Sequence, residues 1–344
     1  MNFYKKDLIK MKRCYTVEPV QIDKKDGFIF ASDGENGEGV ALLGDNFEEK
    51  EELWNDAGGC MSIKQIPGKQ NEFLAIHEFY LKKSPSLSKI VWIKKIDNTW
   101  IKKDLIHFPF IHRMDIVEIN NIKFVIFATI SHFKKNKEDW ELPGAVYAFK
   151  LPNNYFEEFY INPKLIFEGL YKNHGYFNNG KGQLYFSGVQ GIVELNLTNS
   201  YLENWETTNI YNRPTSDMLL YDLDKDGKNE LVKIDDFHGN TVRILKKNKQ
   251  NEYEEQYIYS NGAEIIHGLS VIEIGKTPVV IVSARKGTAE LIAIQYADGE
   301  YVKEVIDSGF GPINVTTANF EDRIYIGVAN HTTNKATIYK LIDS

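Results

Sequence analysis

An internal repeat constrains the fold of this chain more than any other feature of its sequence. An aromatic residue, followed by a short charged and apolar run, recurs at intervals of 43 to 55 residues. The aromatic positions are Tyr4, Phe47, Trp100, Tyr155, Tyr201, Tyr253 and Tyr301. Between them, runs of β-branched and aromatic residues alternate with turn dipeptides, and helical periodicity is almost absent. The repeat therefore predicts seven units of β-structure, each with four strands and with its fourth strand starting at the aromatic residue.

The two ends of the chain predict how these units close. The C-terminal run KATIYKLIDS ends on a third strand, and the first strand, Tyr4–Ile9, has no strands of its own unit before it. Pairing these two ends would leave no unpaired sheet edge. We therefore predict one all-β domain over residues 1–344, a seven-bladed β-propeller whose last blade is closed by the N-terminal strand in a three-plus-one clasp.

Long connections between the predicted strands indicate which face of the propeller binds ligands. Because neighbouring strands are antiparallel, first-to-second turns share one face, and second-to-third connections share the other. The connections from one blade to the next lie on the same face as the second-to-third connections. The longest predicted connections on this face are Glu78–Ser88, His132–Gly144, Ile161–Asn173 and Glu206–Ser216. Insertions gathered on one face of a repeat fold usually mark its binding face.

Charge and composition limit the partners of the chain. The formal net charge is -7, and no concentrated basic run is present, so we expect no nucleic acid partner. No apolar run has membrane-spanning length, and the N-terminal residues lack the apolar segment of a signal peptide. The two cysteines, Cys14 and Cys60, do not form a disulfide framework, and small apolar filling is favoured over a redox pair. We therefore expect a cytoplasmic protein with no membrane partner.

A short acidic stretch, YDLDKDGKNELVKI, stands between two predicted strands of the fifth blade. It supplies carboxylates at alternating positions, then a glycine and a further carboxylate: Asp222, Asp224, Asp226, Gly227 and Glu230. Ca²⁺ takes six to eight oxygen ligands, and a glycine at the sixth position permits the sharp turn that such a loop needs. An EF-hand is excluded because its twelfth position requires a glutamate, and Lys233 stands there.

The pattern D-x-D-x-D-G-x-x-E between two strands resembles the calcium loop of the FG-GAP/VCBS repeat family. The resemblance covers one repeat of the seven. It implies a β-propeller fold and a calcium ion held by Asp222, Asp224, Asp226 and Glu230. Since the loop is predicted on the face opposite the long connections, we expect this calcium to be structural.

Histidines gather on the predicted binding face. His112, His174 and His267 stand where first strands begin, with Asp217 and Asn314 at matching places in other blades. Three converging imidazoles could hold Zn²⁺, Mn²⁺ or Fe²⁺, and the alternative is a wet channel whose polar residues bind only water. Further polar residues stand where second strands end, and they are His77, His132, His238, His331 and Arg285.

These residues suggest an enzyme acting on a sugar or sugar acid, by β-elimination or dehydration. Such chemistry abstracts a proton beside a carboxylate or carbonyl and stabilises the enolate that forms. The predicted catalytic residues are the bases His174, His267 and Tyr176 and the carboxylate-binding Arg113 and Arg285; the alternative for either arginine is a surface ion pair. The predicted substrate-binding residues are His77, His132, Trp140, His238 and His331. The layout is similar to the propeller domains of aldos-2-ulose dehydratases and of seven-bladed polysaccharide lyases.

A second hypothesis is a non-catalytic module that binds a glycan or a protein partner and contains a structural calcium. The two hypotheses predict different surfaces. A carbon–oxygen lyase should hold His112, His174, His267 and an arginine in one narrow pocket. A binding module should instead expose Trp140 and the loop tyrosines on a broad, shallow face.

Overall fold

The computed structural model describes residues 1–80 and 84–342. In this part of the chain the structure consists of β-strands and two short 3₁₀ helices, η1 (Pro85–Leu87) and η2 (Leu202–Asn204). The strands form seven four-stranded antiparallel sheets, which are the blades of a seven-bladed β-propeller. The predicted fold class is confirmed. No helix within the described residues is long and apolar enough to cross a membrane.

The chain divides into two compact units. The terminal unit comprises residues 1–19 and 214–344, and the middle unit comprises residues 20–213. The sheets that lie wholly in the middle unit are β6(Ile63–Gln65) β7(Glu72–His77) β8(Lys89–Ile96) β9(Thr99–His107), then β10(Ile111–Ile119) β11(Ile122–Thr129) β12(Gly144–Lys150) β13(Lys164–Leu170), and β14(Gly175–Asn178) β15(Gln183–Gly188) β16(Gly191–Asn196) β17(Glu206–Tyr211).

The sheets of the terminal unit are β18(Thr215–Tyr221) β19(Glu230–Asp235) β20(Val242–Lys247) β21(Tyr253–Tyr259), then β22(Ala263–Ile274) β23(Thr277–Gly287) β24(Leu291–Ala297) β25(Glu300–Asp307), and β26(Pro312–Phe320) β27(Arg323–Asn330) β28(Lys335–Leu341) β1(Phe3–Lys10). The remaining sheet is β2(Cys14–Ile22) β3(Lys25–Ser32) β4(Gly39–Leu43) β5(Glu49–Trp54). Its first strand begins in the terminal unit and ends in the middle unit.

The second strand of each sheet is mostly buried. Strand β11 has the sequence IKFVIFAT, and its last six residues are buried. A short apolar run without alternation is expected for a strand covered on both faces. The fourth strands have fewer buried residues, because they form the outer edge of their sheets. In β9 the sequence TWIKKDLIH has one buried residue, Leu105, and charged residues protect its exposed edge.

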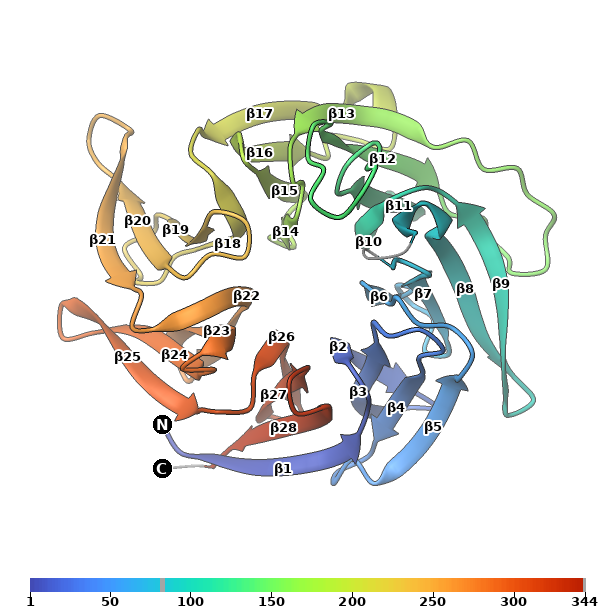
Figure 1. The fold of residues 1–344 in the computed structure, drawn as a ribbon, viewed down its shortest axis with the longest axis horizontal. Helices are drawn as coiled ribbons and strands as arrows, with labels where there is room; N and C mark the ends of the chain where they lie inside the picture. Colours follow the sequence, from blue (N-terminus) through green and yellow to red (C-terminus); the bar gives the residue numbers. More distant parts are fainter. Residues whose placement is uncertain (81–83, 343–344) are drawn as a thin grey trace. The chain divides into compact units, whose positions relative to one another are not determined.

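The clasp predicted from the two ends is confirmed. Strand β1 pairs with β28 in an antiparallel ladder that runs from Phe3 opposite Leu341 to Lys10 opposite Lys335. Asp7 of β1 accepts a hydrogen bond from Thr337 Oγ1 at 2.9 Å and pairs with Lys335 Nζ at 2.5 Å. Figure 1 shows β1 lying beside β28. The last blade therefore draws strands from both ends of the chain.

Two of the four predicted long connections are wrong. The segment Ile161–Asn173 contains the strand β13, and Glu206–Ser216 contains β17. The fourth strands of these two blades thus begin later than the aromatic residues Tyr155 and Tyr201. The cause is that aromatic side chains near these positions pack from loops, ahead of the strands.

In these two blades the aromatic residues serve as anchors of loops. Tyr155 is buried and packs edge-on against Trp92, with ring centroids 5.7 Å apart, before the chain reaches β13. Tyr201 is 66% exposed, and the buried anchor is Trp205, whose Nε1 donates to the carbonyl of Asn199 at 2.8 Å. An aromatic side chain that packs from a loop gives the same sequence spacing as one that starts a strand.

The other two predicted connections are present. Residues 78–88 link β7 to β8, and of these the residues 81–83 lie outside the described part of the chain. The other predicted connection, His132–Gly144, lies between β11 and β12, and its last residue, Gly144, is the first residue of β12.

Candidate functional site

Two of the histidines are placed by β-bulges. The ladder between β10 and β11 shifts register between Ile111 and Arg113, so His112 is the extra residue. The ladder between β22 and β23 shifts between Ile266 and Gly268, so His267 is the extra residue there. A bulge leaves one residue unpaired and redirects its side chain, and bulges are frequent beside functional sites. Both imidazoles are buried, with 4% and 1% of their surface exposed.

In the terminal unit, His267 is held between an amide and a phenol. Its Nδ1 lies 3.0 Å from Oδ1 of Asn314, and its Nε2 lies 3.1 Å from the hydroxyl of Tyr15. The Asn314 amide nitrogen donates to the backbone carbonyl of Tyr15 at 2.6 Å, so its oxygen must face the imidazole. An oxygen can only accept, and Nδ1 therefore carries the proton. In the neutral ring, Nε2 then accepts the Tyr15 hydroxyl proton.

Backbone geometry near His267 is unusual. Ile265, two residues earlier, has φ of 51°, a left-handed conformation that is uncommon for a β-branched residue. The Ile266 amide donates to the carbonyl of Gly239 at 2.9 Å, which ties β22 to the loop after β19. A side chain on Gly239 would meet the carbonyl oxygen of Asp235 at 1.6 Å, so this loop position requires glycine. Strained backbone of this kind is retained where the surrounding contacts fix it.

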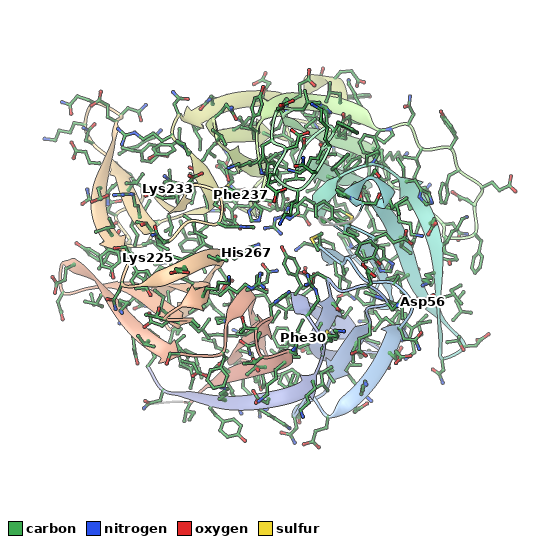
Figure 2. The ribbon with its side chains drawn as sticks, viewed as in Figure 1. Phe30, Asp56, Lys225, Lys233, Phe237 and His267 are labelled. Atoms are coloured by element: carbon green, nitrogen blue, oxygen red, sulfur yellow. The ribbon has the colours of Figure 1, made fainter. Side chains whose placement is uncertain are left out.

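The loop after β19 adds a second imidazole beside His267. The rings of His238 and His267 lie 5.2 Å apart, and His238 also stacks on Phe237 at 4.0 Å. The backbone amide of His238 donates to Ser216 Oγ at 3.1 Å. Figure 2 shows His267 and Phe237 well away from Lys225 of the acidic loop. The terminal unit therefore separates its histidines from its carboxylates.

In the middle unit, His112 and His174 form a pair. Their ring centroids are 4.8 Å apart, and Phe79 packs against His112 at 5.3 Å. Arg113 donates from Nε to the backbone carbonyl of His174 at 2.9 Å, so its guanidinium is fixed beside this pair. The middle unit thus contains two of the three predicted transition-metal ligands, and the third, His267, is a residue of the terminal unit. The metal itself stays a prediction.

Tyr176 of this unit is held by a hydrogen bond and by a ring contact. Its hydroxyl donates to Asp115 Oδ2 at 2.6 Å, and Asn178 donates to the same oxygen at 2.8 Å. The Tyr176 ring packs on Phe186 at 5.3 Å. The carboxylate therefore orients the phenol, and the role of Tyr176 as a base stays a prediction.

The predicted substrate-binding residues fall into different environments. His77 is 1% exposed and lies 4.6 Å from the Trp54 ring, and burial lowers its pKa to about 3, so it is neutral. His132 is partly exposed and lies 3.0 Å from Glu168 Oε2. His331 is buried just after β27, and Arg285 is half-buried in β23. Within the middle unit, His77 is therefore a core residue, whereas His132 is accessible to solvent.

Trp140 is half-buried in the loop between β11 and β12. The Lys134 ammonium lies over its ring, 3.0 Å from the centroid, and also bonds the carbonyl of Asp139. Burial lowers the pKa of Lys134 to about 8. Ser131 Oγ closes the loop by donating to the carbonyls of Phe133 at 2.9 Å and Leu142 at 3.0 Å. Trp140 therefore braces this loop with a half-buried ring.

The acidic loop joins β18 to β19, as predicted. Oxygens of Asp222, Asp224 and Asp226 lie within 4.8 Å of one another, and Glu230 is fully buried at the start of β19. The carboxylates also accept backbone hydrogen bonds: Gly227 donates to Asp222 at 3.0 Å, and Leu223 donates to Glu230 at 2.7 Å. The oxygen chemistry suits Ca²⁺. The calcium ion, and the resemblance that implied it, stay predictions.

Three residues that complete these sites were not predicted in those roles. Tyr15 and Asn314 complete the hydrogen-bonded histidine, and Lys246 contacts the acidic loop. Asn314 stands at the place that matches the histidines of other blades, which is a usable signal. Tyr15 carries no signal in the sequence, because its partner His267 lies far along the chain. Lys246 carries none either, because its direction depends on the register of β20.

Comparison with known proteins supports the fold. No protein family and no curated protein matches the sequence. A chain in a crystal structure of the mitotic checkpoint complex aligns with a TM-score of 0.59 and 9% identity, over 99% of this chain and 91% of that one. A putative oxidoreductase (glucose dehydrogenase) from Thermus thermophilus aligns with a TM-score of 0.49 and 10% identity, over 99% and 100%. At such identities the likeness shows the fold alone.

Proposed function

We propose that the chain is an enzyme that removes a proton next to the carboxylate or carbonyl of a sugar or sugar acid. One observation carries the proposal: the hydrogen-bonded chain Asn314–His267–Tyr15. In this chain the imidazole of His267 can act as a general base, and the amide of Asn314 is the group that fixes its tautomer. A bulge and a left-handed isoleucine hold the imidazole in place, which is more support than a space-filling histidine needs.

In the proposed reaction Tyr15 is the group that touches the substrate. Its hydroxyl oxygen takes the substrate proton while its own proton moves to Nε2 of His267. The imidazolium stays bonded through Nδ1–H to Asn314. In the elimination step Tyr15 returns a proton to the departing oxygen, and His267 returns the borrowed proton to Tyr15. A double bond forms in the substrate, a carbon–oxygen bond breaks, and the enzyme is restored.

Arg285 is proposed to neutralise the substrate carboxylate. It lies on β23, next to Ala284, which pairs with Ile266 of β22 and so is one strand away from the bulge at His267. A guanidinium fork binds a carboxylate through two parallel hydrogen bonds. Neutralising that charge makes the neighbouring proton more acidic and stabilises the enolate.

The test uses purified protein with uronic-acid oligosaccharides and free sugar acids. Unsaturated or dehydrated products are detected by ultraviolet absorbance and mass spectrometry. We expect Tyr15→Phe and His267→Gln each to lower kcat by about 10²–10⁴-fold, the usual contribution of positioned acid–base groups. Tyr221→Phe is the matched control, because its hydroxyl bonds Glu273 in the acidic-loop region. Equal rates for Tyr15→Phe and the unmodified chain would contradict the proposal.

A second candidate function is docking of a partner through the loop between β11 and β12. Phe133 is 53% exposed and Leu142 is 43% exposed, although the loop between them is braced by Ser131 and Lys134. A rigid loop that exposes two apolar side chains loses little conformational entropy on binding. Binding to a glycan array that is lost in the double variant Phe133→Ser, Leu142→Ser, with catalysis absent, would favour this function over the enzyme.

A further inference from the structure

The acidic loop already holds a cation from its own chain. The ammonium of Lys246 on β20 contacts Asp224, lies 2.9 Å from Asp226 Oδ2 and lies 3.0 Å from Glu230 Oε1. These are three of the four carboxylates that match the calcium-loop pattern. The fourth, Asp222, accepts a hydrogen bond from the backbone of the loop itself.

The geometry fits an ammonium ion. The Lys246 ammonium hydrogen-bonds to Asp224 and lies within ion-pair distance of the carboxylates of Asp226 and Glu230. Oxygens at 2.9 and 3.0 Å are at hydrogen-bond distance, whereas Ca²⁺ draws its ligands to 2.3–2.6 Å and requires six to eight of them. The same oxygens cannot serve both cations at once, because Lys246 lies on the side of the loop where they converge.

The charges of the site agree with this geometry. The Lys246 ammonium lies beside three of the four carboxylates, where its positive charge offsets part of the repulsion among them.

The strand register holds Lys246 in this position. Lys246 lies opposite Glu254 of β21, and the preceding residue, Leu245, pairs with Leu231 of β19, next to Glu230. The side chain is partly buried, with 19% of its surface exposed. Lys225, which is in the loop itself, instead pairs with Glu273 of β22 at 2.5 Å. Lys246 of β20 is thus directed to the carboxylates, whereas Lys225 of the loop pairs with a residue outside it.

We propose that Lys246 is an intramolecular competitor of calcium, which keeps the acidic loop folded without a metal ion. A divalent cation can enter only by displacing the ammonium from Asp224, Asp226 and Glu230. This loop therefore differs from a loop that depends on calcium for its structure. The site's ordinary cation is part of the chain.

The experiment compares calcium binding in the unmodified chain and in Lys246→Met. Calorimetric titration with CaCl₂ and thermal unfolding in Ca²⁺ or in EDTA are measured for both. We expect the unmodified chain to have the same Tm in Ca²⁺ and in EDTA. Lys246→Met should bind one Ca²⁺ at least about tenfold more tightly, because a unit charge has been removed a few Å from the ion. Its Tm should rise when Ca²⁺ is added.

Two controls make the result specific. Lys225→Met removes a lysine of the same loop that does not face the carboxylates, so it should leave calcium affinity unchanged. Lys246→Met combined with Asp224→Asn should lose the gained calcium binding. Equal calcium affinity in Lys246→Met and the unmodified chain would overturn the proposal, and so would a tight calcium site in the unmodified chain.

The design also covers a variant that folds poorly. If Lys246→Met is recovered only when Ca²⁺ is present, the calcium ion has replaced the ammonium, which supports the proposal. If it is recovered under neither condition, Lys246→Gln replaces it, and the unmodified chain is titrated with CaCl₂. Absent or weak calcium binding by the unmodified chain supports the proposal, and stoichiometric tight binding refutes it.

Discussion

The terminal unit contains two polar clusters that are stabilised in opposite ways. In the acidic loop, where Glu230 is buried and the aspartates are partly or largely exposed, the charges are balanced by the ammonium of Lys246. In the histidine cluster, both ring nitrogens of the buried His267 are hydrogen-bonded to uncharged partners. A charged cluster becomes costly as soon as its counter-ion is removed, whereas a neutral cluster loses only hydrogen bonds. The difference shows that the free-energy cost of removing one member of a polar cluster depends on whether the cluster is charged.

Removing the counter-ion should have the largest effect. In EDTA, Lys246→Met leaves the fully buried Glu230 and its neighbours without a cation. We expect the free energy of unfolding to fall by about 2–4 kcal/mol, somewhat less than for a wholly buried pair, because the lysine is partly exposed. Urea unfolding followed by circular dichroism measures this. A loss below about 0.5 kcal/mol would place Lys246 among ordinary surface ion pairs and remove the contrast between the clusters.

Removing the neutral imidazole should cost less. His267→Leu keeps an apolar volume but leaves the Tyr15 hydroxyl and the Asn314 amide oxygen without their partner. The expected loss is about 1–3 kcal/mol, the cost of unsatisfied buried polar groups. The loss should be the same at low and high salt, since no charge is involved. His107→Leu, at an exposed histidine, should change stability by no more than about 0.5 kcal/mol. A strong salt dependence for His267→Leu would mean that the ring is charged.

A third buried group, His77 of the middle unit, provides a comparison by pH. Burial lowers its pKa from 6.5 to about 3, and its Nε2 makes no hydrogen bond within the described residues. The unfolded chain takes up a proton below pH 6.5, and the folded chain does not until about pH 3. Stability from this group is therefore present above pH 6.5 and is lost as the pH falls toward 3, by up to about 1.4 kcal/mol per pH unit.

The measurement for His77 is urea unfolding between pH 7 and pH 5. His77→Phe should flatten the part of the pH dependence that this residue contributes. His132→Gln, at a partly exposed histidine, is the control and should keep the slope of the unmodified chain. An unchanged slope in His77→Phe would show that another group causes the loss of stability in acid.

The sequence predicted the fold better than it predicted the sites. The repeat of aromatic residues and the unmatched strand at Tyr4 were sufficient for seven blades and the clasp, because both depend on local periodicity and on pairing every edge. The third and fourth blades show the limit of this approach. Tyr155 packs from a loop, and the spacing of an aromatic residue does not reveal whether a strand or a loop carries it.

The sites depend on contacts that sequence spacing does not encode. Tyr15 and His267 are 252 residues apart, and their hydrogen bond requires strands β2 and β22 both to be in place. Lys246 resembles any lysine on an amphipathic strand until the register of β20 directs it to the acidic loop. His77 was predicted on a binding face, and its burial against Trp54 follows from packing within the fold.

The clasp also determines how the chain responds to mechanical force. Strands β1 and β28 are antiparallel neighbours, and Phe3 and Leu341 form the first pair of their ladder, so both ends leave the sheet at the same place. Tension applied between the two ends is borne by one pair at a time, beginning there and moving toward Lys10 and Lys335. The junction that completes the blade at equilibrium is thus loaded in the unzipping direction, in which hydrogen bonds break in sequence and do not share the load.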